Sequence, residues 1–153
     1  MDGQGQDGVA PLLRENLISY QVIGAAVEVH RQLGPGLLES AYELALCREL
    51  EMRGLQCIRQ KELPIAYKGV DLGCAYRLDI VVGELVVVEI KAVEQLIPLH
   101  KAQLLTYLRL TGYRLGLLIN FNVPVLTKGV KRVVLGLPDD SSAESSARSA
   151  SLR

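Results

Sequence analysis

The sequence has no tryptophan, a single phenylalanine and no excess of charge of either sign. Without large aromatic side chains, the hydrophobic core has to be built from leucine, valine, isoleucine and alanine. The 17 Lys and Arg residues balance the 17 Asp and Glu residues, so the formal net charge is zero. Neutralisation of phosphates by basic residues supplies most of the non-specific affinity for nucleic acid. The charge balance therefore counts against a nucleic-acid-binding function.

Cysteine is also scarce and shows no paired spacing. The three cysteines, Cys47, Cys57 and Cys74, form no CxxC pair and leave one without a partner. A zinc-binding or redox protein would need clusters of His and Cys, which are absent, so we disfavour that class. Reduced structural cysteines are typical of a cytosolic protein, and we expect a cytoplasmic location.

Long apolar runs are missing as well. The longest have the length of a strand, far short of the roughly 20 residues that a membrane helix requires. The opening residues, MDGQGQDGVA, have neither the basic start nor the apolar run of a secretory signal. We therefore expect no association with a membrane.

Composition divides the chain into one folded domain and two polar ends. Residues 1–11 are rich in Gly, Gln and Asp, and residues 138–153 form a Ser/Ala-rich tail with little to bury. We expect both ends to be disordered and residues 12–137 to form one domain, because a chain of 153 residues suits a single hydrophobic core.

Hydrophobic periodicity predicts helices and strands in a mixed order. The sequence Gly34-Pro35-Gly36 separates the first two helices, with Gly past one terminus and Pro near the other. In chain order we expect a helix ending near residue 33, a helix over 37–53, short β segments, strands over 75–82 and 85–91, a helix over 98–110, and strands over 114–121 and 130–137. This order predicts an α/β fold in which helices cover a central sheet.

Three charged residues interrupt the two strands before the third helix. These strands are otherwise apolar, which is typical of strands buried on both faces. Asp79, Glu89 and Lys91 therefore need partners, because buried charges are almost always paired or bound to a metal. Two carboxylates can hold Mg²⁺ or Mn²⁺ and leave coordination positions for water and substrate phosphates. The alternative is a salt bridge between Lys91 and one of the carboxylates.

Lys91 lies two residues beyond Glu89 and therefore points to the same face of the strand. From there it can hold an attacking water or stabilise negative charge at a phosphate. Asp79 and Glu89 lie opposite each other only if the connection between the strands has an odd length, such as the three residues 83–85. The alternation favours this register. It predicts one dry face with Ile80, Val82, Val86, Val88 and Ile90, and one polar face with Arg77, Asp79, Glu89 and Lys91.

Two helices contribute polar residues at spacings that share a helix face. Gln103 and Tyr107 are four residues apart, and Glu39 and Tyr42 are three apart. Taken singly, packing explains both tyrosines, and favourable charge near a helix N-terminus explains Glu39.

Together these residues resemble a known family. The series Glu39, Asp79, Glu89-Ile90-Lys91 and Gln103-Leu-Leu-Thr-Tyr107 resembles the PD-(D/E)XK nuclease superfamily, in particular its RecB-like branch with a QxxxY helix. The segment Gly36-Leu-Leu-Glu39-Ser-Ala-Tyr42 resembles the signature of the small GxxExxY family within it. The resemblance extends from about Leu17 to Leu135, and Leu78 stands where the founding pattern has proline.

The resemblance implies a restriction-endonuclease-like fold, with a central mixed β-sheet flanked by helices. It implies Asp79 and Glu89 as metal ligands, Lys91, Glu39, Gln103 and Tyr107 as catalytic residues, and His30 and Tyr42 as additional candidates. The implied activity is Mg²⁺- or Mn²⁺-dependent hydrolysis of phosphodiester bonds, with DNA preferred and RNA an open alternative. The other hypothesis is a non-catalytic binding or assembly module. A homodimer or a protein partner would help a small neutral domain to hold its substrate.

Overall fold

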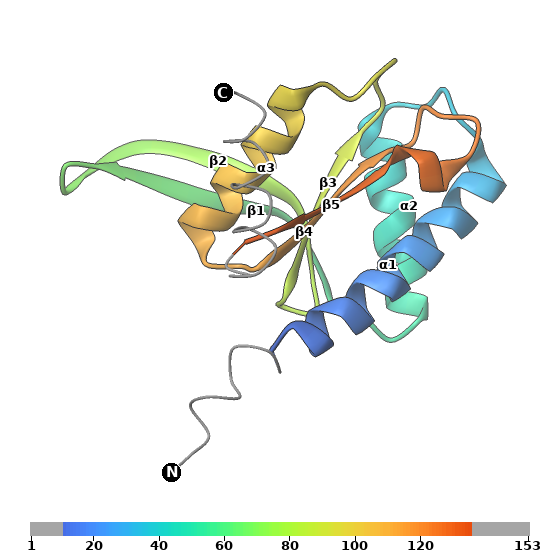
Figure 1. Ribbon diagram of the computed structural model, residues 1–153, viewed down its shortest axis with the longest axis horizontal. Helices are drawn as coiled ribbons and strands as arrows, with labels where there is room; N and C mark the ends of the chain where they lie inside the picture. The colour runs from blue at the N-terminus through green and yellow to red at the C-terminus, as the bar shows by residue number, and fades with distance from the viewer. Residues whose placement is uncertain (1–10, 136–153) are drawn as a thin grey trace, which may run out of the picture.

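The computed structural model describes residues 11–135 (Figure 1). In chain order the elements are α1 (Pro11–Leu33), α2 (Glu39–Met52), β1 (Cys57–Tyr67), β2 (Val70–Val82), β3 (Val86–Lys91), α3 (Pro98–Thr111), β4 (Leu115–Asn120), the 3₁₀ helix η2 (Leu126–Gly129) and β5 (Val130–Val134). Disorder was predicted for residues 1–11 and 138–153. These residues lie outside the described range, except for Pro11, which begins α1. None of the described helices combines the length and the apolar character needed to cross a membrane.

A mixed five-stranded sheet forms the centre of the fold. The strands lie in the order β1-β2-β3-β4-β5, and every neighbouring pair is antiparallel except β3 and β4, which are parallel. Helix α3 connects the two parallel strands, as a parallel pair requires a crossover. Helices α1 and α2 cover one face of the sheet and α3 covers the other (Figure 1). The expected mixed sheet with flanking helices is confirmed.

Two hydrophobic cores lie on the two faces of the sheet. The core under α1 and α2 contains Ile80, Val82, Val86, Val88 and Ile90, the dry face that the alternation predicts. The core under α3 contains Val81 and Val87 together with Leu104 and Leu108 of the helix. Leucine, valine and isoleucine dominate both cores, in agreement with the scarcity of aromatic residues.

Tyr42 organises the connection between α1 and α2. Gly34 and Gly36 adopt positive φ angles of 69° and 100°, which glycine reaches without steric cost. The Tyr42 hydroxyl donates to the carbonyl of Gly34 at 2.6 Å and accepts from the Leu37 amide at 3.1 Å. Its fully buried ring stacks on Phe121, with centroids 4.4 Å apart. The tyrosine therefore fixes the loop before α2 against the end of β4.

The segments between α2 and Gly73 form one long hairpin instead of several short strands. β1 has 11 residues and β2 has 13, and the turn between them uses positive φ angles at Lys68 and Gly69. Pro64 does not end the strand, because β1 is an outer strand and its register shifts between Pro64 and Ala66. A bulge on an outer strand accommodates a residue that lacks a backbone N–H. The hairpin consequently extends beyond the body of the domain as an arm (Figure 1).

The register between β2 and β3 is the one predicted. Ile80 pairs with Val88 and Val82 with Val86. The connection has three residues, of which Gly83 and Glu84 have φ angles of 58° and 59°. This odd connection places Asp79 and Glu89 opposite each other.

Leu104→Ala should lower the free energy of unfolding by about 2–5 kcal/mol, the usual cost of a leucine removed from a packed core. Leu104 is fully buried, and its methyl groups lie so close to Gly116 of β4 that a Cβ there would be only 2.9 Å away. Urea denaturation measures the change. Leu110→Ala on the same helix is the control, because Leu110 is 51% exposed and its loss should cost about 1 kcal/mol or less. Equal costs for the two variants would contradict the placement of α3.

Candidate functional site

Strands β2 and β3 separate at Asp79 and Glu89. The last backbone pair before the separation joins Ile80 and Val88, and from Asp79 towards its start β2 continues with β1 alone. Side chains replace the missing ladder bonds. The Asp79 amide donates to Glu89 Oε1 at 3.2 Å, and the Ile90 amide donates to Asp79 Oδ2 at 2.8 Å. Each carboxylate is thus held by the backbone of the opposite strand.

Next to Asp79, the alternation of side chains between the two faces of the sheet is interrupted in β1 at Gln60. Residues two apart on a regular strand share a face. Here Arg59 Nε lies 3.4 Å from Glu43 Oε1 on α2, whereas Lys61 donates to the Tyr113 hydroxyl at 2.8 Å on the side of α3. The positive φ of 53° at Gln60 accounts for the change of direction. The arm is therefore rotated relative to the rest of the sheet.

The same rotation changes which face of the sheet the β2 side chains before Asp79 point to. It contradicts the position predicted for Arg77. Leu78 packs in the core under α3, whereas Ile80 packs in the core under α1 and α2. Arg77 therefore points away from α3, and its guanidinium lies 3.9 Å from Glu62. The prediction that Arg77 gathers with Asp79, Glu89 and Lys91 is wrong, because strict alternation does not extend past Asp79.

The two carboxylates are costly to ionise in the absence of a cation. Glu89 is only 7% exposed, and burial raises its pKa from 4.5 to about 8, with a further contribution from the negative charge of Asp79. Burial also raises the pKa of Asp79, and the hydrogen bond from Ile90 opposes this increase. The positive charge of Lys91 lowers both pKa values. Two like charges in a partly dry site therefore repel each other.

Lys91 lies close to both carboxylates without pairing with either. Within residues 11–135 no ion pair joins its ammonium group to Asp79 or Glu89. Its side chain is half-buried, and its backbone pairs with Asn120 of β4 in the parallel ladder. The structure therefore does not show the alternative, a salt bridge between Lys91 and one of the carboxylates.

Glu39 reaches the end of β3 from the first turn of α2. Its Oε2 accepts a hydrogen bond from the Ala92 amide at 3.3 Å, one residue after Lys91. Its negative charge also contributes to the raised pKa of Asp79. The structure therefore brings Glu39 to the edge of the carboxylate site.

Glu43 is a neighbour of the site that the sequence reasoning missed. It is 5% exposed, accepts a hydrogen bond from Gln60 Nε2 at 2.8 Å, and contributes more than Glu39 to the raised pKa of Asp79. A signal was present, since Glu43 lies four residues after Glu39 and so shares its helix face.

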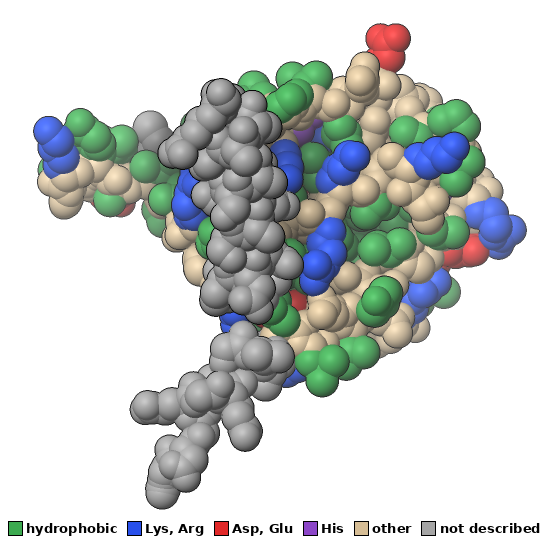
Figure 2. Space-filling model, in the orientation of Figure 1, with side chains coloured by type: hydrophobic (Ala, Val, Ile, Leu, Met, Phe, Trp, Pro, Cys, Tyr) green, Lys and Arg blue, Asp and Glu red, His purple; other side chains and the backbone are tan. Residues whose placement is uncertain are grey.

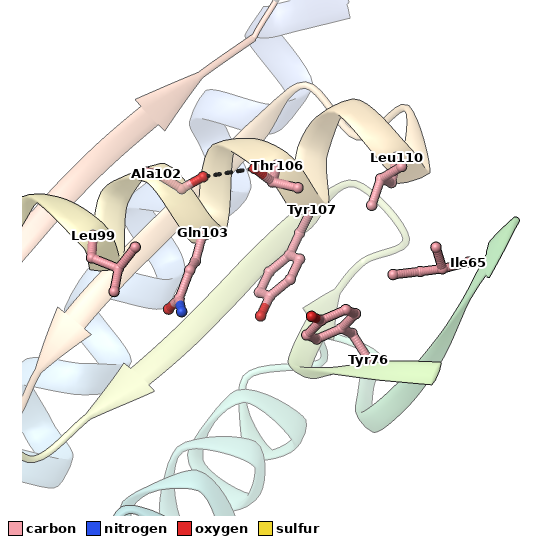
Figure 3. Close-up of a pocket in the computed structure, with 8 residues that line it drawn as sticks. All are labelled: Ile65, Tyr76, Leu99, Ala102, Gln103, Thr106, Tyr107 and Leu110. Carbon is pink, nitrogen blue, oxygen red and sulfur yellow. Dashed lines mark hydrogen bonds between the residues drawn. The ribbon is translucent and has the colours of Figure 1, made fainter. Parts of the chain in front are cut away.

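Gln103 and Tyr107 extend from one face of α3 into a common pocket (Figure 3). Burial raises the pKa of Tyr107, and the negative charges of Glu89 and Asp79 raise it further. Tyr107 therefore lies within electrostatic reach of the carboxylate pair. Gln103 lines the same pocket as Tyr107, but within the described residues no hydrogen bond joins Gln103 to Asp79 or Glu89.

His30 and Tyr42 have structural partners instead. His30 Nε2 donates to the carbonyl of Val123 at 2.7 Å, in the loop after β4. Tyr42 closes the loop before α2, as described above. Roles for these two residues in catalysis stay predictions, and their contacts are those of packing residues.

Asn120 is a second residue that the sequence reasoning missed. It is 2% exposed at the end of β4, where its Oδ1 accepts from the Val93 amide at 3.1 Å and its Nδ2 donates to the Val93 carbonyl at 2.9 Å. This double contact fixes the chain two residues after Lys91. The sequence does show an asparagine at the end of an otherwise apolar strand. That asparagine indicates a role at the site only once the strand is known to lie beside β3.

The donor set of the site fits a hard divalent cation. Within the described part of the chain, no group of three or more His, Cys, Asp or Glu residues could enclose a metal ion. Mg²⁺ does not need such a cage, because it is commonly held by one or two carboxylates, water and substrate phosphates. Asp79 and Glu89 supply the carboxylates, and a cation would relieve the repulsion between them. Basic side chains are spread over the visible face (Figure 2).

The metal-free protein should lose stability as pH rises from about 4.5 to about 8. In this window the folded protein keeps a proton on Glu89 that the unfolded chain has released, because the pKa of Glu89 is raised from 4.5 to about 8. The free energy of unfolding then decreases with pH. Glu89→Gln should remove this contribution. Urea denaturation in EDTA across the window measures it, and the same pH slope in both proteins would contradict the raised pKa.

Comparison with known proteins agrees with this geometry. A family model described as the PD-(D/E)XK nuclease superfamily matches residues 16–133, which is more than half of the chain. The matched range contains α2, the two strands that carry Asp79 and Glu89, and α3. No curated protein and no solved structure gives a significant match. The extent of the family match and the mixed sheet between two layers of helices lead to one conclusion: the chain belongs to the PD-(D/E)XK nuclease superfamily.

Proposed function

We propose that this protein is a metal-dependent nuclease that hydrolyses phosphodiester bonds, with DNA as the preferred substrate. The observation that carries the proposal is the carboxylate pair Asp79 and Glu89, fixed face to face where β2 and β3 separate. Membership of a nuclease superfamily supports a nucleic-acid substrate. A retired site would have no reason to keep two repelling carboxylates beside a lysine in apolar strands.

Asp79 and Glu89 are the residues that would hold Mg²⁺ or Mn²⁺. A bound divalent cation supplies charge neutralisation at the scissile phosphate and lowers the pKa of a coordinated water. The protein contributes the geometry, because the Asp79 and Ile90 amides hold the two carboxylates in place before substrate arrives. Their raised pKa values also mean that metal and protons compete for the same oxygens.

Lys91 carries the second part of the mechanism. It follows Glu89 on the same strand face and is not neutralised by a salt bridge within the described residues. An unpaired ammonium group can hold the attacking water or stabilise charge that develops on the phosphate. Support comes from Tyr107, which the carboxylate charges influence, from Gln103 in the same pocket, and from Glu39, which contacts the end of β3. We assign these three residues to orienting the substrate and the metal-bound water.

The finer family placement is part of the proposal. The segment Gly36-Leu-Leu-Glu39-Ser-Ala-Tyr42 supports the GxxExxY family, and the spacing of Gln103 and Tyr107 supports the RecB-like QxxxY branch. A cytoplasmic location fits this function and remains a prediction.

A non-catalytic binding or assembly module is the second candidate. The specific observation in its favour is zero net charge, with basic side chains dispersed over the visible face (Figure 2). Such a surface holds nucleic acid weakly. The same observation is compatible with an enzyme that grips its substrate as a homodimer or with a protein partner.

Mg²⁺ or Mn²⁺ should raise the melting temperature of the protein. A ligand that binds only the folded state stabilises it by about 2.7 kcal/mol at a hundredfold excess over its Kd. Glu89→Ala should abolish the shift, whereas Lys91→Ala should retain or enlarge it, because a nearby positive charge is removed. Glu62→Ala is the control, since Glu62 is an exposed carboxylate on β1. Thermal denaturation with and without metal measures the shift, and an unchanged shift in Glu89→Ala would exclude this metal site.

Purified protein should cleave DNA only when Mg²⁺ or Mn²⁺ is present, and EDTA, Glu89→Ala and Lys91→Ala should each abolish cleavage. Single-stranded DNA, duplex DNA and RNA are assayed in parallel by gel electrophoresis. Glu62→Ala again serves as the control and should cleave like the wild type. Metal-induced stabilisation without cleavage of any substrate would favour the binding module or a missing partner. Cleavage that survives both EDTA and Glu89→Ala would refute the mechanism.

A further inference from the structure

A pocket of about 310 Å³ lies between α3 and the β1–β2 arm. Its walls include Ile65, Tyr76, Leu99, Gln103, Tyr107 and Leu110 (Figure 3). Tyr107 belongs both to this wall and to the electrostatic surroundings of Glu89 and Asp79. Tyr76, a second wall residue, lies three residues before Asp79 on β2, so the pocket and the proposed catalytic site lie along the same strand.

The chemistry of the walls selects a neutral, flat ligand. Within residues 11–135, none of the residues that line the pocket carries a charged side chain, so a phosphate or another ion would find no counter-charge among them. Tyr76 and Tyr107 face each other with ring centroids 5.8 Å apart and planes inclined by 44°. Tyr76 is 52% exposed, which leaves much of its ring free to contact a ligand. Aromatic rings with free area are stacking surfaces for other flat rings.

A side-chain amide is available to orient such a ligand. The Gln103 amide extends into the pocket and offers both donors and an acceptor (Figure 3). Thr106 is already engaged, since its hydroxyl donates to the Ala102 carbonyl at 3.0 Å. The pocket thus combines stacking surface with one amide that can hydrogen-bond to the edge of a ring.

We propose that this pocket binds one unpaired nucleobase of the strand being cleaved, stacked on Tyr76 and contacted at its edge by Gln103. The inference rests on the proposed nuclease function, because it places the phosphate of the same strand at Asp79 and Glu89. A base inside an intact duplex is stacked and paired and cannot enter. The protein therefore acts on single strands, or on duplexes that present unpaired nucleotides, in preference to intact duplex. Stacking tolerates any base, so sequence preference is weak.

Binding of a short fluorescein-labelled oligothymidylate tests the pocket, in Mg²⁺ and with the Lys91→Ala substitution so that the strand stays intact. Tyr76→Ala should weaken binding roughly five- to a hundredfold, the range that loss of one base–aromatic stack produces. Tyr76→Phe should preserve affinity, because it retains the ring. Tyr67→Ala is the matched control, since Tyr67 is an exposed tyrosine of the same arm outside the pocket lining. Circular dichroism verifies folding of each variant.

An oligonucleotide with abasic residues separates base binding from backbone binding. The protein with Tyr76 intact should bind it as weakly as Tyr76→Ala binds oligothymidylate. Equal affinity of Tyr76→Ala and its parent for oligothymidylate, or undiminished binding of the abasic strand, would overturn the pocket. A third result would also overturn the pocket. If sedimentation shows that the protein is a dimer and that Tyr76→Ala dissociates it, the pocket is an interface between two copies.

Cleavage by proteins that retain Lys91 distinguishes failure of this inference from failure of the proposed function. Metal-dependent cleavage with the same single-strand to duplex ratio in wild type and Tyr76→Ala would refute the pocket and leave the nuclease intact. Tyr76-dependent binding without any cleavage would support the pocket and favour the non-catalytic binding module over the nuclease. A lower ratio in Tyr76→Ala, with cleavage of duplex retained, is the result we expect.

Discussion

Asp79 and Glu89 each accept a hydrogen bond from the backbone of the opposite strand at the point where β2 and β3 part. This exchange solves a physical problem. Two carboxylates that are largely removed from water repel each other and lose hydration, which is costly unless hydrogen bonds or a counter-charge compensate. The backbone amides satisfy one oxygen of each carboxylate and fix its direction. Within the described residues, the other oxygen of each carboxylate accepts no hydrogen bond and can bind a cation. Because a cation would neutralise the repulsion between the carboxylates, that repulsion favours its binding.

The end of β3 is held from three sides, and this explains how a small domain keeps the site rigid. Asp79 of β2 contacts the Ile90 amide, Glu39 of α2 contacts the Ala92 amide, and Asn120 of β4 contacts both backbone groups of Val93. Lys91 lies within this stretch. The three contacts come from separate elements of the fold, so the position of the lysine is a property of the packed domain and not of its own strand.

The sequence predicted the parts of the fold that depend on local pattern. Alternation in the two apolar strands predicted their register and a three-residue connection, and Gly34 and Gly36 predicted the break between two helices. Glu43 and Asn120 were missed because their importance depends on which elements become neighbours. Arg77 was misplaced because Gln60 adopts a positive φ, and glutamine gives no sequence signal for that conformation. The long arm was read as several strands because Pro64 usually ends one.

Those irregularities of β1 have a consequence for the behaviour of the protein at high concentration. Within the described residues, β1 is an outer strand, and an outer strand with a regular row of free N–H and C=O groups is a template for pairing with another molecule. Pro64 removes one donor from this row, the shift beside it breaks the spacing, and the reversal at Gln60 turns the next residues to the other face. A second copy therefore finds no long stretch of matching backbone. Edge-to-edge pairing of the arm with a second copy is therefore disfavoured.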